Sequence, residues 1–190
     1  MRIETTKKLF TVDEYYRMGD AGIFKPEARL ELIEGEIFEM SPIRNRHAAC
    51  VNRAIELFIT VLTGKAVVSG QNPVLLSNYS VPQPDVVLAK LRDDFYFNKR
   101  LSVEDTFLVV EVSDTTRVYD RKIKLPLYAR ASVPEVWIED LQKNRLLVFR
   151  HPAGSTFSSS LVLNRNNTVS PLAFPDTSFS VGDLLLSKFL

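Results

Sequence analysis

The chain has 190 residues and a formal net charge of +1, with 45% hydrophobic and 25% charged residues. These are the values of an ordinary globular domain, so they exclude a strongly basic protein that binds nucleic acid through net charge alone. The single cysteine, Cys50, excludes an intrachain disulfide and a cysteine-rich metal site, and we expect it to be a small buried apolar residue.

Length and patterning predict one domain over residues 1–190, with a core at about 29–150. Residues 151–190 are more polar and predict a peripheral C-terminal segment of short strands and loops. The N-terminus has no apolar signal-peptide core, and no run approaches the roughly 20 apolar residues of a membrane span. We therefore expect a cytoplasmic protein.

Two helices are predicted in the first third of the chain. Thr11 and Glu14 form a capping-box pattern, which predicts a short helix over 11–18. Helical spacing of apolar residues predicts a second helix over 45–63. The apolar face of this second helix consists of Ala48, Val51, Ala54, Ile55, Phe58, Ile59 and Leu62.

Residues 29–40 predict a β-hairpin, because two short apolar runs flank the turn signal Glu34-Gly35. Two further acids, Glu31 and Glu36, lie on its strands. A solvated strand face is the ordinary interpretation of both.

Apolar runs predict the remaining strands, at 66–68, 73–76, 85–89, 106–113, 136–139 and 145–150. The run 106–113 does not alternate, which is typical of a central strand covered on both faces. Residues 90–105 predict a loop with a helical turn. Residues 114–116 offer a helix N-cap, and residues 117–131 have helical composition. Pro126 costs about 3 kcal/mol inside a regular helix, so we expect a disturbed middle turn.

Two acids, Asp85 and Glu111, fall within or beside runs that should be buried. Burying a carboxylate without a partner costs several kcal/mol, and a divalent metal is one of the few partners that satisfies two carboxylates at once. A lysine on the adjacent helix, such as Lys124, could orient water or neutralise charge on phosphorus. Such a set suffices for phosphodiester hydrolysis, although Lys124 could equally form a surface ion pair with Asp120 at i, i+4.

Three basic residues stand at the start of the second helix: Arg44, Arg46 and His47. Cations at a helix N-terminus oppose the macrodipole, so they contribute little to helix stability there. This position favours phosphate contact, with a surface or satisfied core histidine as the alternative for His47.

Several motifs together resemble one known family, the Uma-type putative restriction endonucleases of the PD-(D/E)XK nuclease superfamily. The resemblance covers roughly residues 10–150. The motifs that carry it are Glu31-Leu32-Ile33-Glu34-Gly35-Glu36, Ser41-Pro42 with His47, Pro84-Asp85, Glu111-Val112-Ser113, Asp120 with Lys124 and Tyr128, and Glu135 with Trp137.

The resemblance implies an α/β (α+β) fold with a restriction-endonuclease-like core, a mixed β-sheet flanked by helices, preceded by the N-terminal helix and hairpin. It implies that Asp85 and Glu111 are metal ligands and that Glu31 is the upstream acid that completes the metal site. The superfamily lysine position is Ser113 here, and the family resemblance moves the lysine to Lys124 on the following helix. Lys122 is the alternative, and on a regular helix the two lie about 200° apart, so only one would face the site.

The implied function is a Mg²⁺-dependent DNA endonuclease, with Mn²⁺ as a possible substitute and a homodimer to reach both strands of a duplex. Backbone contacts are expected from Arg44, Arg46, His47, Arg117, Arg121 and Lys122. One alternative is a catalytically inactive nuclease fold that binds nucleic acid or a protein partner. Another is cleavage of structured DNA or RNA ends. For Tyr128 and Trp137 we expect core packing, and for Glu135 a role at a helix end.

Overall fold

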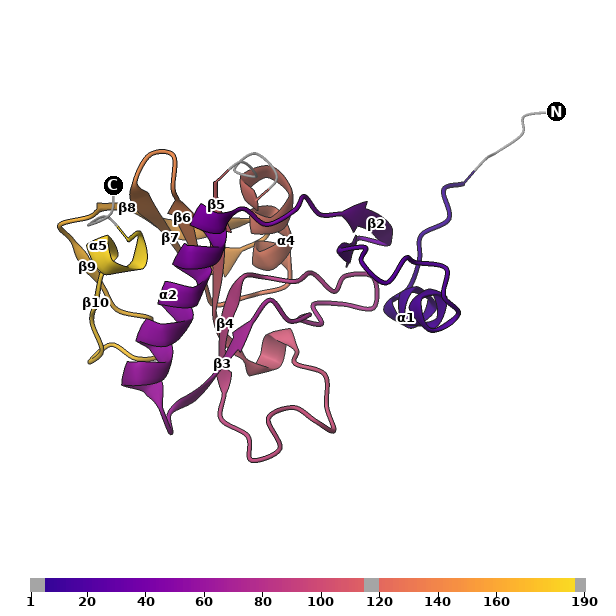
Figure 1. Cartoon of the computed structure of the whole chain (residues 1–190), viewed down its shortest axis with the longest axis horizontal. Helices are drawn as coiled ribbons and strands as arrows, with labels where there is room; N and C mark the ends of the chain where they lie inside the picture. The colour runs from indigo at the N-terminus through magenta and orange to yellow at the C-terminus, as the bar shows by residue number, and fades with distance from the viewer. Residues whose placement is uncertain (1–5, 115–119, 187–190) are drawn as a thin grey trace.

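The computed structural model describes residues 6–114 and 120–186, with only the backbone described for Asp120 and Arg121. Its centre is a six-stranded sheet in the order β3-β4-β5-β6-β7-β8 (Figure 1). The strands are β3 (Ala66–Gly70), β4 (Val86–Lys90), β5 (Thr106–Ser113), β6 (Glu135–Asp140), β7 (Arg145–Ala153) and β8 (Thr156–Asn164). The expectation of a mixed sheet flanked by helices is confirmed.

Neighbouring strands in this sheet run antiparallel, except that β5 and β6 are parallel. A parallel pair needs a crossover connection, and here the chain between β5 and β6 supplies it with helical segments. These are η2 (Asp120–Lys124), a π-helical turn, and α4 (Leu125–Arg130), with Pro126 in its first turn. The expected disturbed turn is confirmed, whereas the cap expected at 114–116 falls largely outside the described residues.

Helices cover both faces of the sheet. Successive residues of β4 and β5 are therefore buried alternately in two different clusters. One cluster joins α2 (Asn45–Leu62) and α5 (Val181–Leu184) to Val86 and Leu88. The other joins α4 to Val87 and Ala89. Trp137 and Cys50 are buried in the first cluster, as expected. Ile59 differs from the expected apolar face of α2, because it is exposed.

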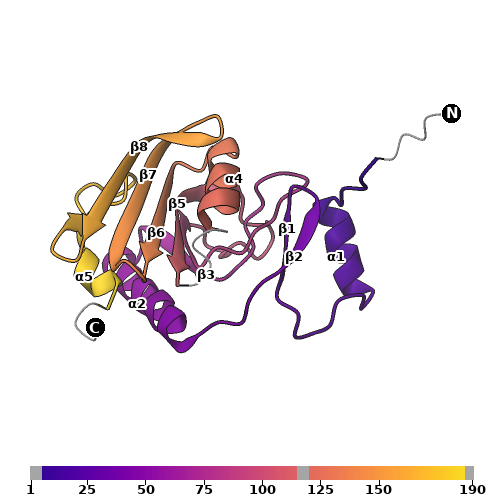
Figure 2. The same cartoon turned by 90° about the horizontal axis from the view of Figure 1, so that it is seen from above.

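The N-terminal elements form a smaller unit beside the sheet (Figure 2). They are α1 (Val12–Asp20), β1 (Leu30–Ile33) and β2 (Glu36–Glu39). The Thr11–Glu14 capping box is present. At the hairpin turn Glu34 has φ 50° and Gly35 φ 81°, the pair of positive values that a type I′ turn requires.

The segment 73–76 is not a strand, contrary to expectation. The amides of Val74, Leu75 and Leu76 donate to carbonyls in three separate places, at Pro82, Leu101 and Ser80. Because no single strand supplies these acceptors, only an isolated bridge between Leu75 and Ser102 forms. The helical turn expected in 90–105 is η1 (Val103–Asp105).

The expectation of only short peripheral strands beyond residue 151 is wrong for β8. This nine-residue strand pairs with β7 along its length and forms one edge of the main sheet. Two short strands, β9 (Thr168–Val169) and β10 (Phe179–Ser180), and α5 follow, and Phe179 and Leu184 are buried beside α2. These core residues are widely spaced within a polar segment, so they form no apolar run that would predict a buried element.

No helix within residues 6–114 and 120–186 is both long and apolar enough to cross a membrane. The cytoplasmic location and the homodimer stay predictions.

Candidate active site

The pairing of β4 with β5 brings two acids together. Val86 pairs with Val110, so the next residue on each strand is Asp85 on one and Glu111 on the other. Opposite residues of an antiparallel pair have Cβ atoms about 5 Å apart. Both carboxylates are nearly buried, with exposed fractions of 7% and 3%.

Asp85 is surrounded by hydrogen-bond donors. Its Oδ2 lies 3.1 Å from Nε2 of His47 and accepts a 2.8 Å bond from the Val112 amide. Its Oδ1 accepts from the side-chain amide of Gln71 at 3.3 Å. Burial opposes ionisation, but the hydrogen bonds and positive charge of His47, the Val112 bond and the charge of Lys124 outweigh it and lower the pKa of Asp85.

Glu111 is held from the other side of the site by Lys124 and Tyr128. Lys124 Nζ lies 3.2 Å from Glu111 Oε1, and the Tyr128 hydroxyl donates to the same oxygen at 2.5 Å. Lys124 is only 4% exposed, so it is not part of a surface ion pair. It projects from a π-helical turn, a distortion that is frequent at functional sites.

Glu31 does not lie on a solvated strand face, contrary to the ordinary interpretation. It is fully buried, 3.3 Å from Lys124 Nζ, and its Oε2 accepts a bond from the Gln83 amide. The hairpin packs against the main unit, and this contact cannot be read from local patterning. Glu36 is exposed, as that interpretation expected.

A pocket of about 780 Å³ opens at this end of the molecule. Asp85, Glu111, Val112 and Lys124 line it, whereas Glu31 is not on its wall. Figure 2 shows the end of β5 between α4 on one side and the connection from β2 to α2 on the other. Solvent and a ligand can therefore reach the two acids.

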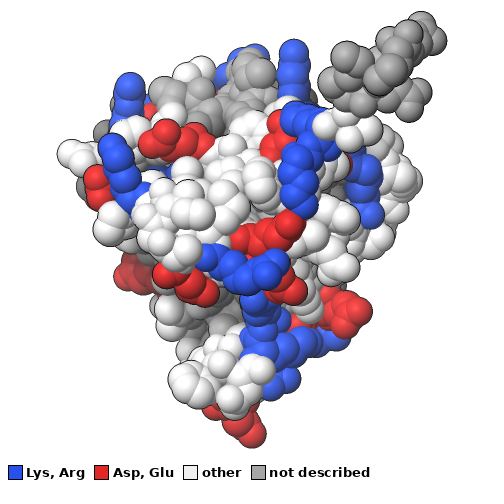
Figure 3. Space-filling view, turned by 90° about the vertical axis from the view of Figure 1, so that its right-hand side faces the viewer, with Lys and Arg blue, Asp and Glu red and all other residues white. Residues whose placement is uncertain are grey.

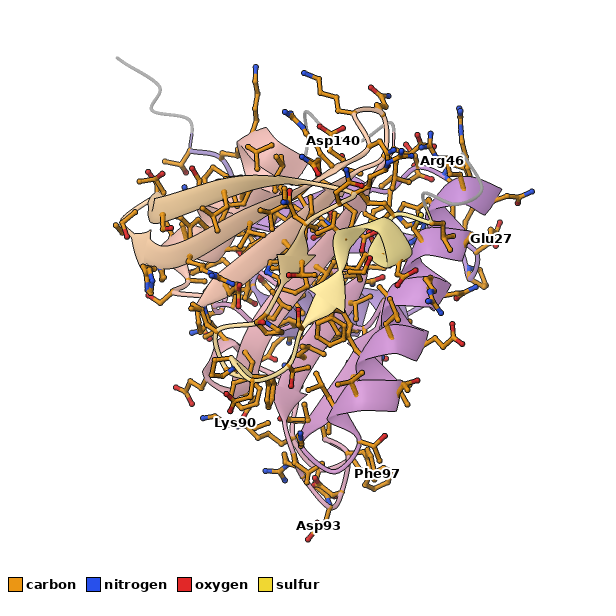
Figure 4. All side chains as sticks on the ribbon, turned by 90° about the vertical axis from the view of Figure 1, so that its left-hand side faces the viewer. Glu27, Arg46, Lys90, Asp93, Phe97 and Asp140 are labelled. Atoms are coloured by element: carbon orange, nitrogen blue, oxygen red, sulfur yellow. The ribbon has the colours of Figure 1, made fainter. Side chains whose placement is uncertain are left out.

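The predicted nucleic-acid contacts divide into three groups. Arg44, His47 and Lys122 line the pocket. Arg46 does not, because its guanidinium donates to the Leu141 carbonyl at 2.7 Å, near Asp140 at the same end of the molecule (Figure 4). The Arg121 side chain and Arg117 lie outside the described residues.

Lys122 and Lys124 both line the pocket. Of the two, Lys124 is the one whose ammonium group lies within ion-pair distance of the acids, 3.2 Å from Glu111 and 3.3 Å from Glu31. Only Lys124 is buried against the acids; Lys122 is exposed. Sequence reasoning missed Arg29 and Gln71, and nothing in their sequence surroundings marks either.

Ser113, at the position where the superfamily carries lysine, is fully buried on β5. Its hydroxyl has no hydrogen-bond partner among the residues that the structure describes. It shares a face with Glu111, two residues earlier on the strand. Lys124 thus reaches Glu111 from the crossover segment rather than from β5.

Glu135 does not hold a helix end, contrary to expectation. Its buried carboxylate accepts bonds from Trp137 Nε1, the Arg150 guanidinium and the Leu172 amide. These contacts join β6 and β7 to the C-terminal segment, so the residue has a structural role.

Glu139, on β6, is fully buried, and neither carboxylate oxygen has a partner among the described residues. Burial and repulsion from Asp85 raise its pKa well above the usual 4.5. The folded state therefore holds this proton more tightly than the unfolded state does. As pH rises from about 4.5 towards the folded-state pKa, this group lowers the free energy of unfolding.

Glu139→Leu should raise the free energy of unfolding at pH 7 by about 1–3 kcal/mol, because it removes an unpaired buried carboxyl group. The gain should grow from pH 4 to pH 8, measured by urea unfolding. Glu27→Leu, at an exposed position, is the matched control and should change stability by less than about 0.5 kcal/mol. A gain in stability that is absent, or equal at all pH values, would contradict the raised pKa of Glu139.

Tyr128→Phe should lower the rate of the metal-dependent cleavage that the sequence motifs predict about 10- to 100-fold, because the hydroxyl that orients Glu111 is lost while the ring remains packed. Tyr96→Phe is the control, since the Tyr96 hydroxyl also donates to an oxygen acceptor, the Lys90 carbonyl, at the far end of the molecule (Figure 4). Equal cleavage by the two variants would exclude the positioning role.

The donor set fits a divalent metal. Asp85 and Glu111 offer hard carboxylate oxygens on one open pocket, and Mg²⁺ commonly uses only one or two protein carboxylates with water and phosphate. Among the described residues no group of three His, Cys, Asp or Glu side chains is arranged to hold a metal ion. Glu31, the third acid, forms an ion pair with Lys124 at 3.3 Å.

A family model described as "Putative restriction endonuclease", Uma2, matches residues 12–182. The chain belongs to this family. The family is one of nucleases, and its description agrees with the resemblance in the sequence motifs. The matched range takes in Asp85, Glu111 and Lys124, and it extends over β7 and β8 as well.

The Uma2 chain also has a solved structural relative. The crystal structure of a putative nuclease belonging to DUF820 from Anabaena variabilis matches with a TM-score of 0.71 and 16% sequence identity. The match covers 93% of this chain and 98% of the other. At this identity the match shows a shared fold. No curated protein matches the sequence significantly.

Proposed function

We propose that this Uma2 protein is a Mg²⁺-dependent endonuclease that hydrolyses phosphodiester bonds of DNA, with Mn²⁺ able to replace Mg²⁺. The observation that carries the proposal is the meeting of Asp85, Glu111 and Lys124 on one open pocket. A protein that only binds a partner has no use for two nearly buried acids on the wall of a pocket beside a buried lysine, since burying each charge costs desolvation energy.

Asp85 and Glu111 are the proposed metal ligands, and the Val112 carbonyl is a further candidate. When bound there, the ion would supply a more acidic water and would neutralise charge on the scissile phosphate. His47 and Gln71 hold the Asp85 carboxylate in place, and Tyr128 holds Glu111.

Lys124 is the proposed third catalytic residue. Its ammonium group is placed to orient the attacking water or to stabilise negative charge that develops on phosphorus. Glu31 contacts Lys124 from behind the pocket wall, so we assign it to positioning this lysine rather than to binding the metal directly. The exposed Arg44 and Lys122 at the pocket would receive the neighbouring phosphates.

The deciding experiment combines calorimetry with Mg²⁺ or Mn²⁺ and a plasmid-nicking assay on the same protein. We expect metal binding, nicking with either ion and none in EDTA. Asp85→Ala and Glu111→Ala should lose both properties while remaining folded.

Two other results would redirect the proposal. If the native protein binds DNA or a protein but neither metal nor nicking is detected, the inactive binding fold is supported instead. If an RNA of matched sequence is cleaved and DNA is not, the assignment of DNA as substrate is wrong. Sedimentation equilibrium tests the predicted homodimer independently.

A further inference from the structure

Part of the lining of the catalytic pocket is apolar. Phe38, Met40 and Ile43, from β2 and the connection to α2, line the pocket, and so does Ile123 from the π-helical turn. Ile43 and Ile123 are each 39% exposed although they stand beside charged groups. Exposed apolar side chains around a concave site commonly mark the surface that a ligand covers.

Phosphates and sugars make no favourable contact with apolar side chains, because they are recognised by cations and hydrogen-bond donors. The apolar surfaces of a nucleic acid are the faces of its bases, and these are accessible only where a base is unstacked and unpaired. Resting on the proposed nuclease function, we propose that the substrate is DNA that is single-stranded beside the scissile phosphate, with an unpaired base seated against Ile43 and Ile123.

The charge of the pocket supports base contacts over backbone contacts. Leaving His47 aside, the described lining residues include four acids and four bases. The acids are Glu39, Asp85, Glu111 and Asp114, and the bases are Arg29, Arg44, Lys122 and Lys124. Acidic and basic side chains are also interspersed on the neighbouring face of the molecule (Figure 3). Such a surface gains little from counterion release, which supplies most of the affinity for duplex DNA.

The size of the pocket agrees with this substrate. A volume of about 780 Å³ lies within the range of roughly 300–1,000 Å³ typical of sites that enclose one small ligand. A nucleotide and its flanking phosphates are of that scale, whereas an intact duplex is not. Because Ile43 and Ile123 line the same pocket as Asp85 and Glu111, a base can contact the isoleucines while the adjacent phosphate lies at the acids.

The test compares three DNA substrates of one sequence with the full chain and Mn²⁺: a single strand, a blunt duplex, and a duplex with a single-stranded tail. We expect kcat/KM to be at least 10-fold higher for the single strand and the tail than for the blunt duplex. Ile43→Ser and Ile123→Ser should each raise KM for the single strand about 10-fold, because each removes an apolar side chain that the base would bury, with metal affinity in calorimetry unchanged.

Ile59→Ser is the matched control, because Ile59 is also an exposed isoleucine but lies on α2 away from the pocket. It should leave KM unaltered. A strand with an abasic nucleotide beside the cleaved bond should be a poor substrate for the native protein and equally poor for Ile43→Ser.

The outcomes separate this inference from the proposed function. Cleavage of the blunt duplex as fast as of the single strand, or unchanged KM in both isoleucine variants, would overturn the inference and leave the nuclease intact. Failure to cleave any of the three substrates would overturn both.

Discussion

Asp85→Asn should reduce metal-dependent DNA cleavage by about 100- to 1,000-fold, the several kcal/mol of transition-state stabilisation that a catalytic metal supplies. The substitution keeps the size of the side chain and its hydrogen bonding to Gln71, but it removes the charge that holds the ion. The lowered pKa of Asp85 means that this charge is already present in the folded protein. Single-turnover cleavage and calorimetric titration with Mn²⁺ measure the two losses.

Asp105→Asn is the matched control for this experiment. Asp105 is also 7% exposed and is paired with Lys99 and Ser102, but it does not line the catalytic pocket. Its variant should lose stability and keep metal binding and cleavage. If Asp85→Asn cleaves as well as this control, Asp85 is not a metal ligand.

Lys124→Met should lower the free energy of unfolding by about 3–5 kcal/mol and also abolish cleavage, because it removes the cation between two buried carboxylates. The methionine nearly preserves volume, so the loss reports on charge rather than on a cavity. Urea unfolding and the nicking assay measure the two effects. Lys122→Met, at an exposed position, should change stability by less than about 0.5 kcal/mol.

A double variant separates stability from catalysis. Adding Glu31→Gln to Lys124→Met removes one of the two buried negative charges that Lys124 contacts in the native protein. It should recover part of the lost stability without recovering cleavage. Recovery of cleavage would show that Lys124 serves only to neutralise Glu31. An unchanged stability in the single variant would contradict the buried ion pair.

The elements that the sequence predicted best are those with a strong local signal. The capping box at Thr11 marks α1, the Glu34-Gly35 turn marks the hairpin, and the non-alternating apolar residues of 106–113 mark a central strand. Each of these signals is carried by residues close together in the chain. The segment 73–76 misled because its β propensity was local, whereas the backbone partners that decided its conformation were not.

The candidate site divides in the same way. Asp85 and Glu111 stood out because charges interrupt apolar runs, and the structure brings them together with Lys124; their roles in catalysis stay predictions. The sequence predicts a solvated Glu31, because the burial of this residue depends on how the hairpin packs against the crossover segment, which local patterning does not show. The sequence does not predict the positions of Gln71 and Glu139, because the register of β3 and β6 against the neighbouring strands decides what these side chains face.

The site draws one group each from β1, α2, the start of β4, β5 and η2, so it spans residues 31 to 124. Closing loops of this length costs entropy that no local contact offsets, and chains rich in such contacts fold slowly. During refolding, helical structure in α2 can return early, but the metal affinity proposed for Asp85 and Glu111 can return only when the whole constellation has assembled. Metal binding, if present, would therefore report completion of the fold, and a partly folded chain would have its helices without the assembled site.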